Sequence, residues 1–308
     1  MLSEVLGNPL RGEVMRIDLD RYRLSESEYS EISKMMASLN GSLDLESLWG
    51  LMDQVWFEVG CASRPFRQES LEEFYKHPVW ALNGIFIEHD PDSMDHRRAF
   101  AKALSAFKPQ QVLEVGGGFG TLARLMSQES PDAQISLFEP YPSQCMLSLC
   151  GQNPQIKFVA EFESDAYDML VCTDVLEHVL KPLDLLVTMI AAVQVGGYLL
   201  IANCFEPVIA CHLPSTFHLR YSFDDFCSRL GLRKLDSIDL PYGAIYQKID
   251  SISLQKDVLH RLEIRSQRLY PLKAWSERWL APWAARFSKA RQEPMHYLRQ
   301  LAERLRQW

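Results

Sequence analysis

Four residues in one short segment could bind a charged, nucleotide-like ligand: Glu114, Gly116, Gly118 and Gly120. They follow a run of apolar residues and precede a segment of helical character. Glycine lacks a Cβ atom and tolerates positive φ, so a ligand can approach bare backbone where the turn meets the helix N-terminus. The segment therefore predicts a buried strand, a ligand-binding glycine turn, and a helix that begins near Thr121.

Three further apolar segments end in polar residues that could complete such a site. Glu139 follows the apolar segment Ile135–Phe138, and an acid about 20 residues past a glycine turn is placed to accept hydrogen bonds from a ribose hydroxyl pair. Asp174 and Asn203 end two later apolar segments. Ligands of open parallel sheets bind at the carboxyl ends of strands, where these residues are expected.

The glycine spacing separates two kinds of nucleotide cofactor. A dinucleotide fingerprint needs a small residue three positions after its second glycine, and Thr121 stands there. The Glu-x-Gly-x-Gly-x-Gly pattern instead resembles motif I of the class I S-adenosylmethionine-dependent methyltransferases. Tyr167–Val171 and Asp174–Val179 resemble the fourth-strand signature of their small-molecule branch, F-D-x-V…D-V-L-E-H-V, and His218–Phe226 resembles the segment after their fifth strand.

This resemblance covers residues from about 106 to 250 and implies the fold. It implies an α/β, Rossmann-like, mainly parallel seven-stranded sheet with helices on both faces. The late strands are expected at 233–240 and 244–254, the second of them antiparallel. We predict three regions: an N-terminal helical region on the lid or substrate side (1–105), the Rossmann-like domain (106–255), and a basic, Trp-rich C-terminal helical segment (256–308).

The first region carries helix signals and few strand signals. Ser25–Glu28 has the order of a capping box, and Gly41 is a typical stop. Apolar residues at helical spacing predict further helices over 43–57, 70–81 and 93–107.

The resemblance implies S-adenosyl-L-methionine as the cofactor and gives roles to individual residues. Glu114 would contact the methionine amino group, and Glu139 the ribose diol. Glu161 and Phe162, at the end of the third strand, would contact adenine, although the loop that follows them is shorter than in relatives. Asp174 would cap the next helix or line the cofactor pocket, two compatible roles. The expected cofactor-binding residues are Glu114, Gly116, Gly118, Gly120, Glu139, Glu161, Phe162, Asp174 and Val175.

Methyl transfer to a hydroxyl of high pKa calls for a general base, and histidine is the side chain best suited to that near neutral pH. Three histidines are candidates for a catalytic role: His178, His212 and His218. His178 could equally hold its loop or contact the cofactor. We expect no metal, because only Asp174 stands where a carboxylate-rich magnesium site would need a ligand.

The amino-acid composition excludes some classes of binding partner and favours one cellular compartment. The formal net charge of -8 and the pI near 5.5 argue against general nucleic-acid binding. The absence of an Asn/Asp-Pro-Pro-Tyr/Phe tetrapeptide after the fourth strand disfavours base or amide nitrogen as the acceptor. Seven cysteines without C-x-x-C spacing favour a reduced, cytoplasmic protein without a zinc site. No stretch has the length and apolar character of a signal peptide or a membrane span.

The C-terminal segment has a different character. Residues 265–308 hold ten Lys or Arg, and Trp275, Trp279 and Trp283 recur at helical spacing on one face. These tryptophans either pack on the domain or contact an anionic membrane or a protein partner.

Together these features predict a methyltransferase that acts on oxygen or nitrogen of a small molecule or glycan-type metabolite. Two alternatives stay open: a non-catalytic cofactor-binding scaffold, and an enzyme on a membrane-associated, lipid-linked glycan.

Overall fold

The computed structural model describes residues 15–63, 67–236, 238, 240–251 and 254–279. The described residues divide into two compact units. The larger unit comprises the residues up to 217 together with 223–251, and the smaller unit comprises 218–222 and 254–279.

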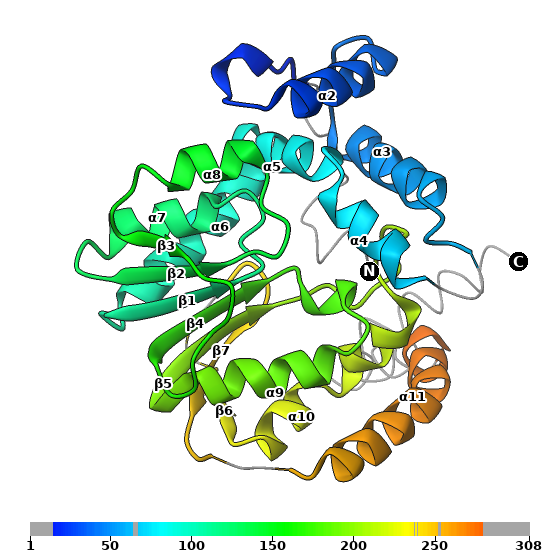
Figure 1. The fold of residues 1–308 in the computed structure, drawn as a ribbon. Helices are drawn as coiled ribbons and strands as arrows, with labels where there is room; N and C mark the ends of the chain where they lie inside the picture. The colour runs from blue at the N-terminus through cyan, green and yellow to red at the C-terminus, as the bar shows by residue number, and fades with distance from the viewer. Residues whose placement is uncertain (1–14, 64–66, 237, 239, 252–253, 280–308) are drawn as a thin grey trace, which may run out of the picture. The chain divides into compact units, whose positions relative to one another are not determined.

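A seven-stranded sheet forms the centre of the larger unit (Figure 1). Its strands are β1 (Gln111–Val115), β2 (Gln134–Phe138), β3 (Ile156–Phe158), β4 (Tyr167–Thr173), β5 (Val193–Ala202), β6 (Leu232–Lys234) and β7 (Ala244–Lys248). They lie in the order β3-β2-β1-β4-β5-β7-β6, and only β7 runs antiparallel to its neighbours. This confirms the predicted sheet, including its antiparallel strand. Both late strands are shorter than predicted, because β6 covers Leu232–Lys234 and β7 ends at Lys248.

The strand order reverses between β1 and β4, which pair in parallel. The loops that follow these two strands therefore leave the sheet in opposite directions along its edge and open a crevice at the carboxyl ends, where ligands of such sheets bind. The glycine turn follows β1, and the segment from Asp174 to His178 follows β4.

Helices cover both faces of the sheet, as predicted (Figure 1). On one face lie α6 (Pro91–Ser105), α7 (Thr121–Glu129) and α8 (Gln144–Cys150), and on the other lie α9 (Pro182–Ala192) and α10 (Phe223–Arg229). Because parallel strands are buried on both faces, they need nearly continuous apolar sequence, and five of the seven residues of β4 are buried. Phe100, Met126 and Leu137 belong to the core on the first face.

The N-terminal part of the larger unit is helical. It consists of the single 3-10 turn η1 (Leu19–Arg21) and the helices α2 (Glu26–Ser38), α3 (Leu45–Glu58), α4 (Gln68–Lys76) and α5 (Val79–His89). The predicted capping box is present: the backbone N–H of Glu28 donates to Ser25 Oγ at 3.2 Å, and the backbone N–H of Ser25 donates to Glu28 Oε2 at 2.7 Å. The backbone φ of Gly41 is +74°, which fits its place just after α2.

The helix predicted over 70–81 is wrong, because α4 ends at Lys76 and α5 begins at Val79. His77 has an extended ψ of 140°, as expected for a residue that precedes proline, and Pro78 is the N-cap residue of the next helix. α6 also begins two residues earlier than predicted, where Asp90 accepts the backbone N–H of Ser93 at 2.9 Å.

The N-terminal helices share a hydrophobic core with the loop that follows β5. Trp56, Phe74 and Leu82 pack in one cluster with Cys211 and Leu213 of that loop. The backbone N–H of Ala210 also donates to Asp53 Oδ1 of α3 at 2.7 Å. The loop after β5 is therefore held by the N-terminal helices rather than left free.

A second contact joins the N-terminal helices to the glycine turn. A Cβ atom on Gly84 of α5 would lie 2.3 Å from Phe119, the residue between the last two glycines of the turn. Phe119 also packs with Ile85 and Cys145. The absent side chain of Gly84 makes room for the phenyl ring.

The smaller unit consists of α11 (Lys256–Trp279) and the short segment His218–Ser222, which belongs to the end of η3 (Pro214–Tyr221) and the residue after it. Within this unit Arg220 and Tyr221 both pair with Glu277, and Ser266 Oγ donates to Ser222 Oγ at 2.7 Å. Trp275 and Trp279 are each 55% exposed, and Trp283 lies outside the described residues.

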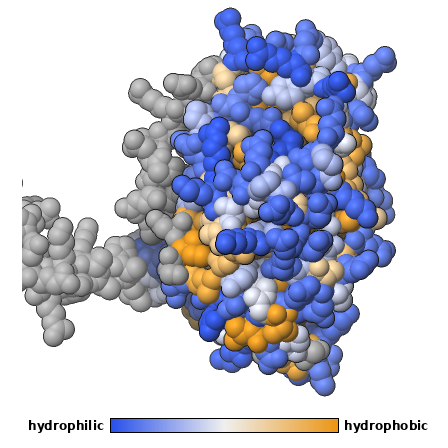
Figure 2. Space-filling view, turned by 90° about the vertical axis from the view of Figure 1, so that its left-hand side faces the viewer, coloured by the Kyte–Doolittle hydropathy of each residue, from blue (hydrophilic) through white to orange (hydrophobic). Residues whose placement is uncertain are grey.

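The surface in Figure 2 is mostly hydrophilic, and hydrophobic side chains gather there in small separate patches. Among the described helices, none combines the length and the apolar character needed to cross a membrane.

Candidate active site

The glycine turn after β1 has one glycine that faces open space. Gly118 has φ +54°, and apart from its two chain neighbours no described residue has an atom within 4 Å of the position that a Cβ atom would take. Gly116 and Gly120 serve packing instead: their Cβ atoms would lie 2.3 Å from Val175 Cγ2 and 2.2 Å from Cys150 Sγ. A ligand can therefore approach the backbone at Gly118, and the other two glycines bring protein groups close around it.

Glu139 closes the turn from the end of β2. Its Oε2 accepts the backbone N–H of Gly118 at 2.9 Å, and its Oε1 accepts that of Tyr141 at 3.0 Å. Burial raises the pKa of this carboxyl, and the two N–H groups oppose that shift. Each carboxylate oxygen accepts more than one hydrogen bond, so Glu139 keeps the capacity to bind a ribose diol.

Glu114 lies under the turn in β1 and is 4% exposed. Its Oε2 has no hydrogen-bond partner among the residues that the structure describes. Burial raises the pKa of Glu114 to about 8. A buried acceptor without a partner costs free energy, which a ligand ammonium group would recover, as the expected contact with a methionine amino group requires.

The remaining expected cofactor residues lie near the same edge of the sheet. Phe162 packs edge-on against Phe138 of β2 with ring centroids 5.2 Å apart, whereas Glu161 is exposed. Asp174 follows β4 with φ +56°, and its Oδ2 accepts the hydroxyl of Tyr242 at 2.8 Å. The predicted capping role of Asp174 is wrong, because the N-cap residue of the short helix that follows is Val175 and that helix has no side-chain cap.

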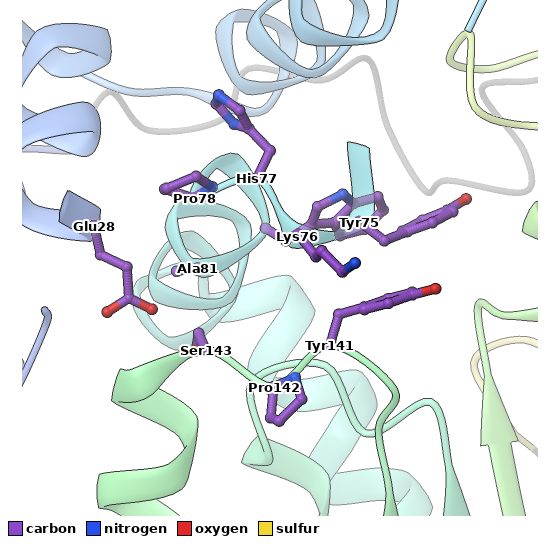
Figure 3. A pocket seen from close by; sticks show the side chains of 10 residues that line it. Glu28, Tyr75, Lys76, His77, Pro78, Ala81, Tyr141, Pro142 and Ser143 are labelled. Atoms are coloured by element: carbon purple, nitrogen blue, oxygen red, sulfur yellow. The ribbon is translucent and has the colours of Figure 1, made fainter. Parts of the chain in front are cut away.

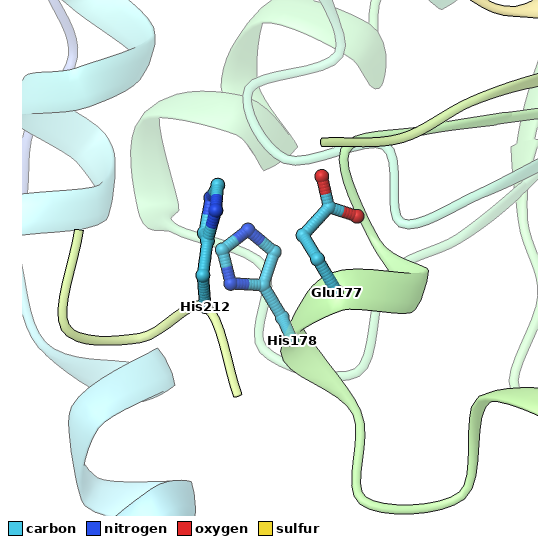
Figure 4. Close-up of side chains that lie close together, drawn as sticks. All are labelled: Glu177, His178 and His212. Carbon is cyan, nitrogen blue, oxygen red and sulfur yellow. The ribbon is translucent and has the colours of Figure 1, made fainter. Parts of the chain in front are cut away.

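Two of the three candidate histidines lie together with an acid (Figure 4). Glu177 and His178 belong to η2 (Leu176–His178) after β4, and His212 lies on the loop after β5. The two imidazole centroids are 4.9 Å apart at 75°. One carboxylate oxygen and one ring nitrogen of each histidine lie within 4.8 Å of one another. We call Glu177, His178 and His212 the histidine cluster.

Backbone hydrogen bonds fix this cluster. His178 Nδ1 lies 3.1 Å from the carbonyl oxygen of Cys211, and His212 Nδ1 lies 2.7 Å from that of Glu206. The N–H of Leu213 donates to the Glu177 carbonyl oxygen at 2.9 Å, which ties the loops after β4 and β5 together. The cluster is thus built by two loops that lock onto each other.

Burial sets the charge of the histidine cluster. It lowers the pKa of His178 to about 3, with a further contribution from His212, and it lowers the pKa of His212 as well. Burial and then repulsion from Asp174 raise the pKa of Glu177. Both imidazoles are therefore uncharged at neutral pH and keep a lone pair for a proton or another electrophile.

A pocket is lined by residues of α4, α5 and the loop after β2, together with Glu28 of α2 (Figure 3). Tyr75 and Trp80 line it and contact His178, with ring centroids 6.3 and 5.9 Å from the imidazole. On another wall stands Tyr141, whose backbone N–H binds Glu139. The sequence interpretation missed Tyr75 and Tyr141, because only the folded chain brings α4 and the loop after β2 together.

His218 lies in the smaller unit. Its Nδ1 lies 3.0 Å from Ser266 Oγ, its Nε2 lies 4.0 Å from Glu263, and burial lowers its pKa to about 4. Its catalytic role stays a prediction.

The sequence profile of the methyltransferase domain family matches residues 86–240, half of the chain. The chain belongs to this family, and it is a class I methyltransferase that depends on S-adenosylmethionine. The matched range contains the whole glycine turn, Glu139 and the histidine cluster.

Solved structures with a similar fold include three named proteins. An O-methyltransferase family protein from Burkholderia thailandensis is 14% identical, with 67% of this chain and 73% of that one covered and a TM-score of 0.47. The plantazolicin methyltransferase, solved with a pentazolic desmethylPZN analogue and SAH, is 18% identical, with 45% and 62% covered and a TM-score of 0.31. The pyocyanin biosynthetic protein is 18% identical, with 51% and 56% covered and a TM-score of 0.39. The match spans less than two thirds of the latter two proteins. No curated protein sequence is significantly similar to the chain.

Proposed function

We propose that this enzyme methylates an oxygen or nitrogen atom of a small molecule or glycan-type metabolite. The observation that carries the proposal is a pocket with Tyr141 on one wall, next to the cofactor acid, and with Tyr75 and Trp80 on another, next to His178. Such an arrangement holds an acceptor between the group that binds the cofactor and the groups that can take a proton.

The cofactor side fits S-adenosylmethionine. The open backbone at Gly118 leaves space for the ligand, Glu114 offers a buried oxygen to its ammonium group, and Glu139 offers two oxygens to its ribose. When bound there, the cofactor supplies a methyl group that is already activated for transfer, so orientation and exclusion of water account for much of the rate.

On the acceptor side, the aromatic rings and the histidine cluster have separate tasks. The faces of Tyr75 and Trp80 suit an aromatic ring or the apolar face of a sugar. Trp80 Nε1 is buried and, among the described residues, has no hydrogen-bond partner, so it is available to a polar acceptor atom. We assign the activation of the acceptor to the histidine cluster, because its imidazoles are uncharged, fixed by backbone hydrogen bonds and keep a free lone pair.

The same proposal covers the compartment and the C-terminal helix. All seven cysteines lie in the described part of the chain and are free, which supports a reducing, cytoplasmic environment. The exposed Trp275 and Trp279 support a second possibility, in which the acceptor is carried by a lipid at a membrane surface.

If His218 takes part in catalysis, His218→Ala lowers turnover more than it lowers cofactor affinity.

The test combines a binding and a turnover measurement on the full, untagged chain. Calorimetry with S-adenosylhomocysteine should give a dissociation constant in the micromolar range or below. Cofactor labelled in its methyl group should then label at least one member of a panel of phenols, sugars and amines. Binding without transfer to any of them would favour the scaffold, and absence of binding by folded protein would overturn the assignment of the site.

The lipid-linked reading is tested by sedimentation with anionic liposomes. It predicts that the full chain pellets with them and that Trp275→Ala/Trp279→Ala reduces pelleting. Equal behaviour of the two proteins would contradict it.

A further inference from the structure

We propose that Glu177, His178 and His212 bind one divalent transition-metal ion, and that this ion also takes the acceptor's oxygen. The first part depends on the geometry of the histidine cluster alone. The second part depends on the proposed function.

The three ligand atoms are nearly close enough already. They lie within 4.8 Å of one another, so a common centre is at most about 2.8 Å from each (4.8 divided by the square root of three). Typical zinc distances are about 2.0–2.2 Å to histidine nitrogen and carboxylate oxygen. A closure of less than about 1 Å per ligand therefore completes the site, within the reach of small side-chain rotations.

The hydrogen bonds of the two histidines leave the correct nitrogen available. A backbone carbonyl oxygen can only accept, so the Nδ1 atoms facing Cys211 and Glu206 must each carry the hydrogen. The Nε2 atom of each ring then keeps its lone pair. Metal-binding histidines have this arrangement, in which the second nitrogen donates to a carbonyl or carboxylate and fixes the tautomer.

A buried carboxylate oxygen of Glu177 is a second, independent indication that a cation binds here. Its side chain is fully buried; Oε1 accepts the backbone N–H of Cys204 at 2.7 Å, while Oε2 has no partner within the described part of the chain. The other two members of the cluster are uncharged rings. A cation at the centre would satisfy Oε2 and compensate the carboxylate, which is costly to bury alone.

The ligand set points to the class of metal. Two imidazole nitrogens and one carboxylate oxygen suit zinc, manganese, iron, cobalt or nickel rather than calcium or magnesium, which prefer oxygen. Sequence reasoning expected no metal because it searched for a carboxylate-rich magnesium site. Three protein ligands also leave a coordination position open, as catalytic sites do and purely structural ones do not.

An acceptor hydroxyl at that open position would lose its proton more easily, because a bound divalent ion lowers the pKa of an oxygen ligand. In the transfer the proton leaves to solvent, the acceptor oxygen forms a bond to the methyl carbon, and the carbon–sulfur bond breaks with its electron pair staying on sulfur. The neutral thioether and the methylated acceptor are the products.

The first experiment measures metal binding without turnover. Untagged full chain is treated with a chelator, dialysed, and titrated separately with Zn²⁺, Mn²⁺ and Co²⁺ by calorimetry, and the absorption of bound Co²⁺ is recorded. We expect one ion per chain, and an affinity at least tenfold weaker in both Glu177→Gln and His212→Asn. His260→Asn, an exposed histidine on α11, is the matched control and should bind as the parent does.

S-adenosylhomocysteine affinity is measured on the same samples to show that each variant is folded. No binding of any of the three ions by the parent, or equal binding by parent and both cluster variants, overturns the metal site. Product formed at an undiminished rate in the metal-free enzyme overturns the second part and leaves the proposed function standing. Metal binding by a folded parent that has no affinity for S-adenosylhomocysteine would overturn the proposed function and leave the metal site standing.

Discussion

The cofactor side and the acceptor side of this enzyme are built from different material. The cofactor side consists of the backbone of the glycine turn and the side chains of Glu114 and Glu139, all within one short continuous segment of the sequence. The acceptor side uses side chains from Tyr75 to His212, which loops and helices bring together only in the folded chain. Recognition of the shared cofactor is thus local, and recognition of the acceptor is not.

The largest effect should come from the acceptor side alone. His212→Ala removes one of the lone pairs with which the histidine cluster activates the acceptor, so we expect turnover to fall about 10²- to 10⁴-fold, a loss as large as that of a positioned acid–base group. Affinity for S-adenosylhomocysteine should change less than threefold, because Glu139 and the turn are untouched. Steady-state rates and calorimetry measure the two quantities, and a parallel loss of both would show that the two sides are not separate.

Glu139→Gln should give the opposite pattern. The amide can still accept from Tyr141 but carries no charge, and hydrogen bonds to charged groups are worth about 1.5–3 kcal/mol, so the affinity for S-adenosylhomocysteine should fall about 10- to 100-fold. Asp168→Asn is the control from the far end of the sheet, where Asp168 accepts the N–H groups of Gln110 and Gln111. It should lower stability and leave affinity unchanged.

Two glycines of the turn should separate binding from folding. Gly118→Ala should lower the free energy of unfolding by about 1–2 kcal/mol through left-handed backbone strain. It should also weaken cofactor binding, because the new Cβ would stand in the open space that the cofactor is proposed to fill. Gly120→Ala adds to that strain a contact of 2.2 Å with Cys150 Sγ, and overpacking costs about 1–3 kcal/mol more. Denaturant unfolding measures both. Adding Cys150→Ala to Gly120→Ala should recover part of the loss, and no recovery would contradict the packing role.

A separate effect should be a pH dependence of stability set by Glu114. Its pKa is raised from the ordinary 4.5 to about 8, so the folded free enzyme holds a proton that the unfolded chain releases. The contribution to stability is full below pH 4.5 and is lost as the pH rises through 8. Glu114→Gln should therefore melt progressively higher than the parent between pH 5 and 8.5. The gap should close with saturating S-adenosylhomocysteine, and a constant gap would argue against the shift.

The elements that local sequence controls could be predicted. The capping box of α2, the apolar strands β1, β2 and β4, and the glycine turn follow from neighbours within a few residues. The helix predicted over 70–81 failed where Pro78 overrode the apolar spacing, and that signal was visible in the sequence. The pairing of His178 with His212 was not predictable, because it depends on the bond between Leu213 and Glu177 and on the anchoring of Ala210 by Asp53.

The contact between Gly84 and Phe119 limits how this protein could exchange parts with its relatives. A larger residue at position 84 would require a smaller one at position 119, because the phenyl ring of Phe119 occupies the space where a side chain of residue 84 would lie. We therefore expect the two positions to change together over evolution. A chimaera that joins a foreign helical region to this sheet just after α6 would inherit the mismatch, whereas a transplant that carries both residues would avoid it.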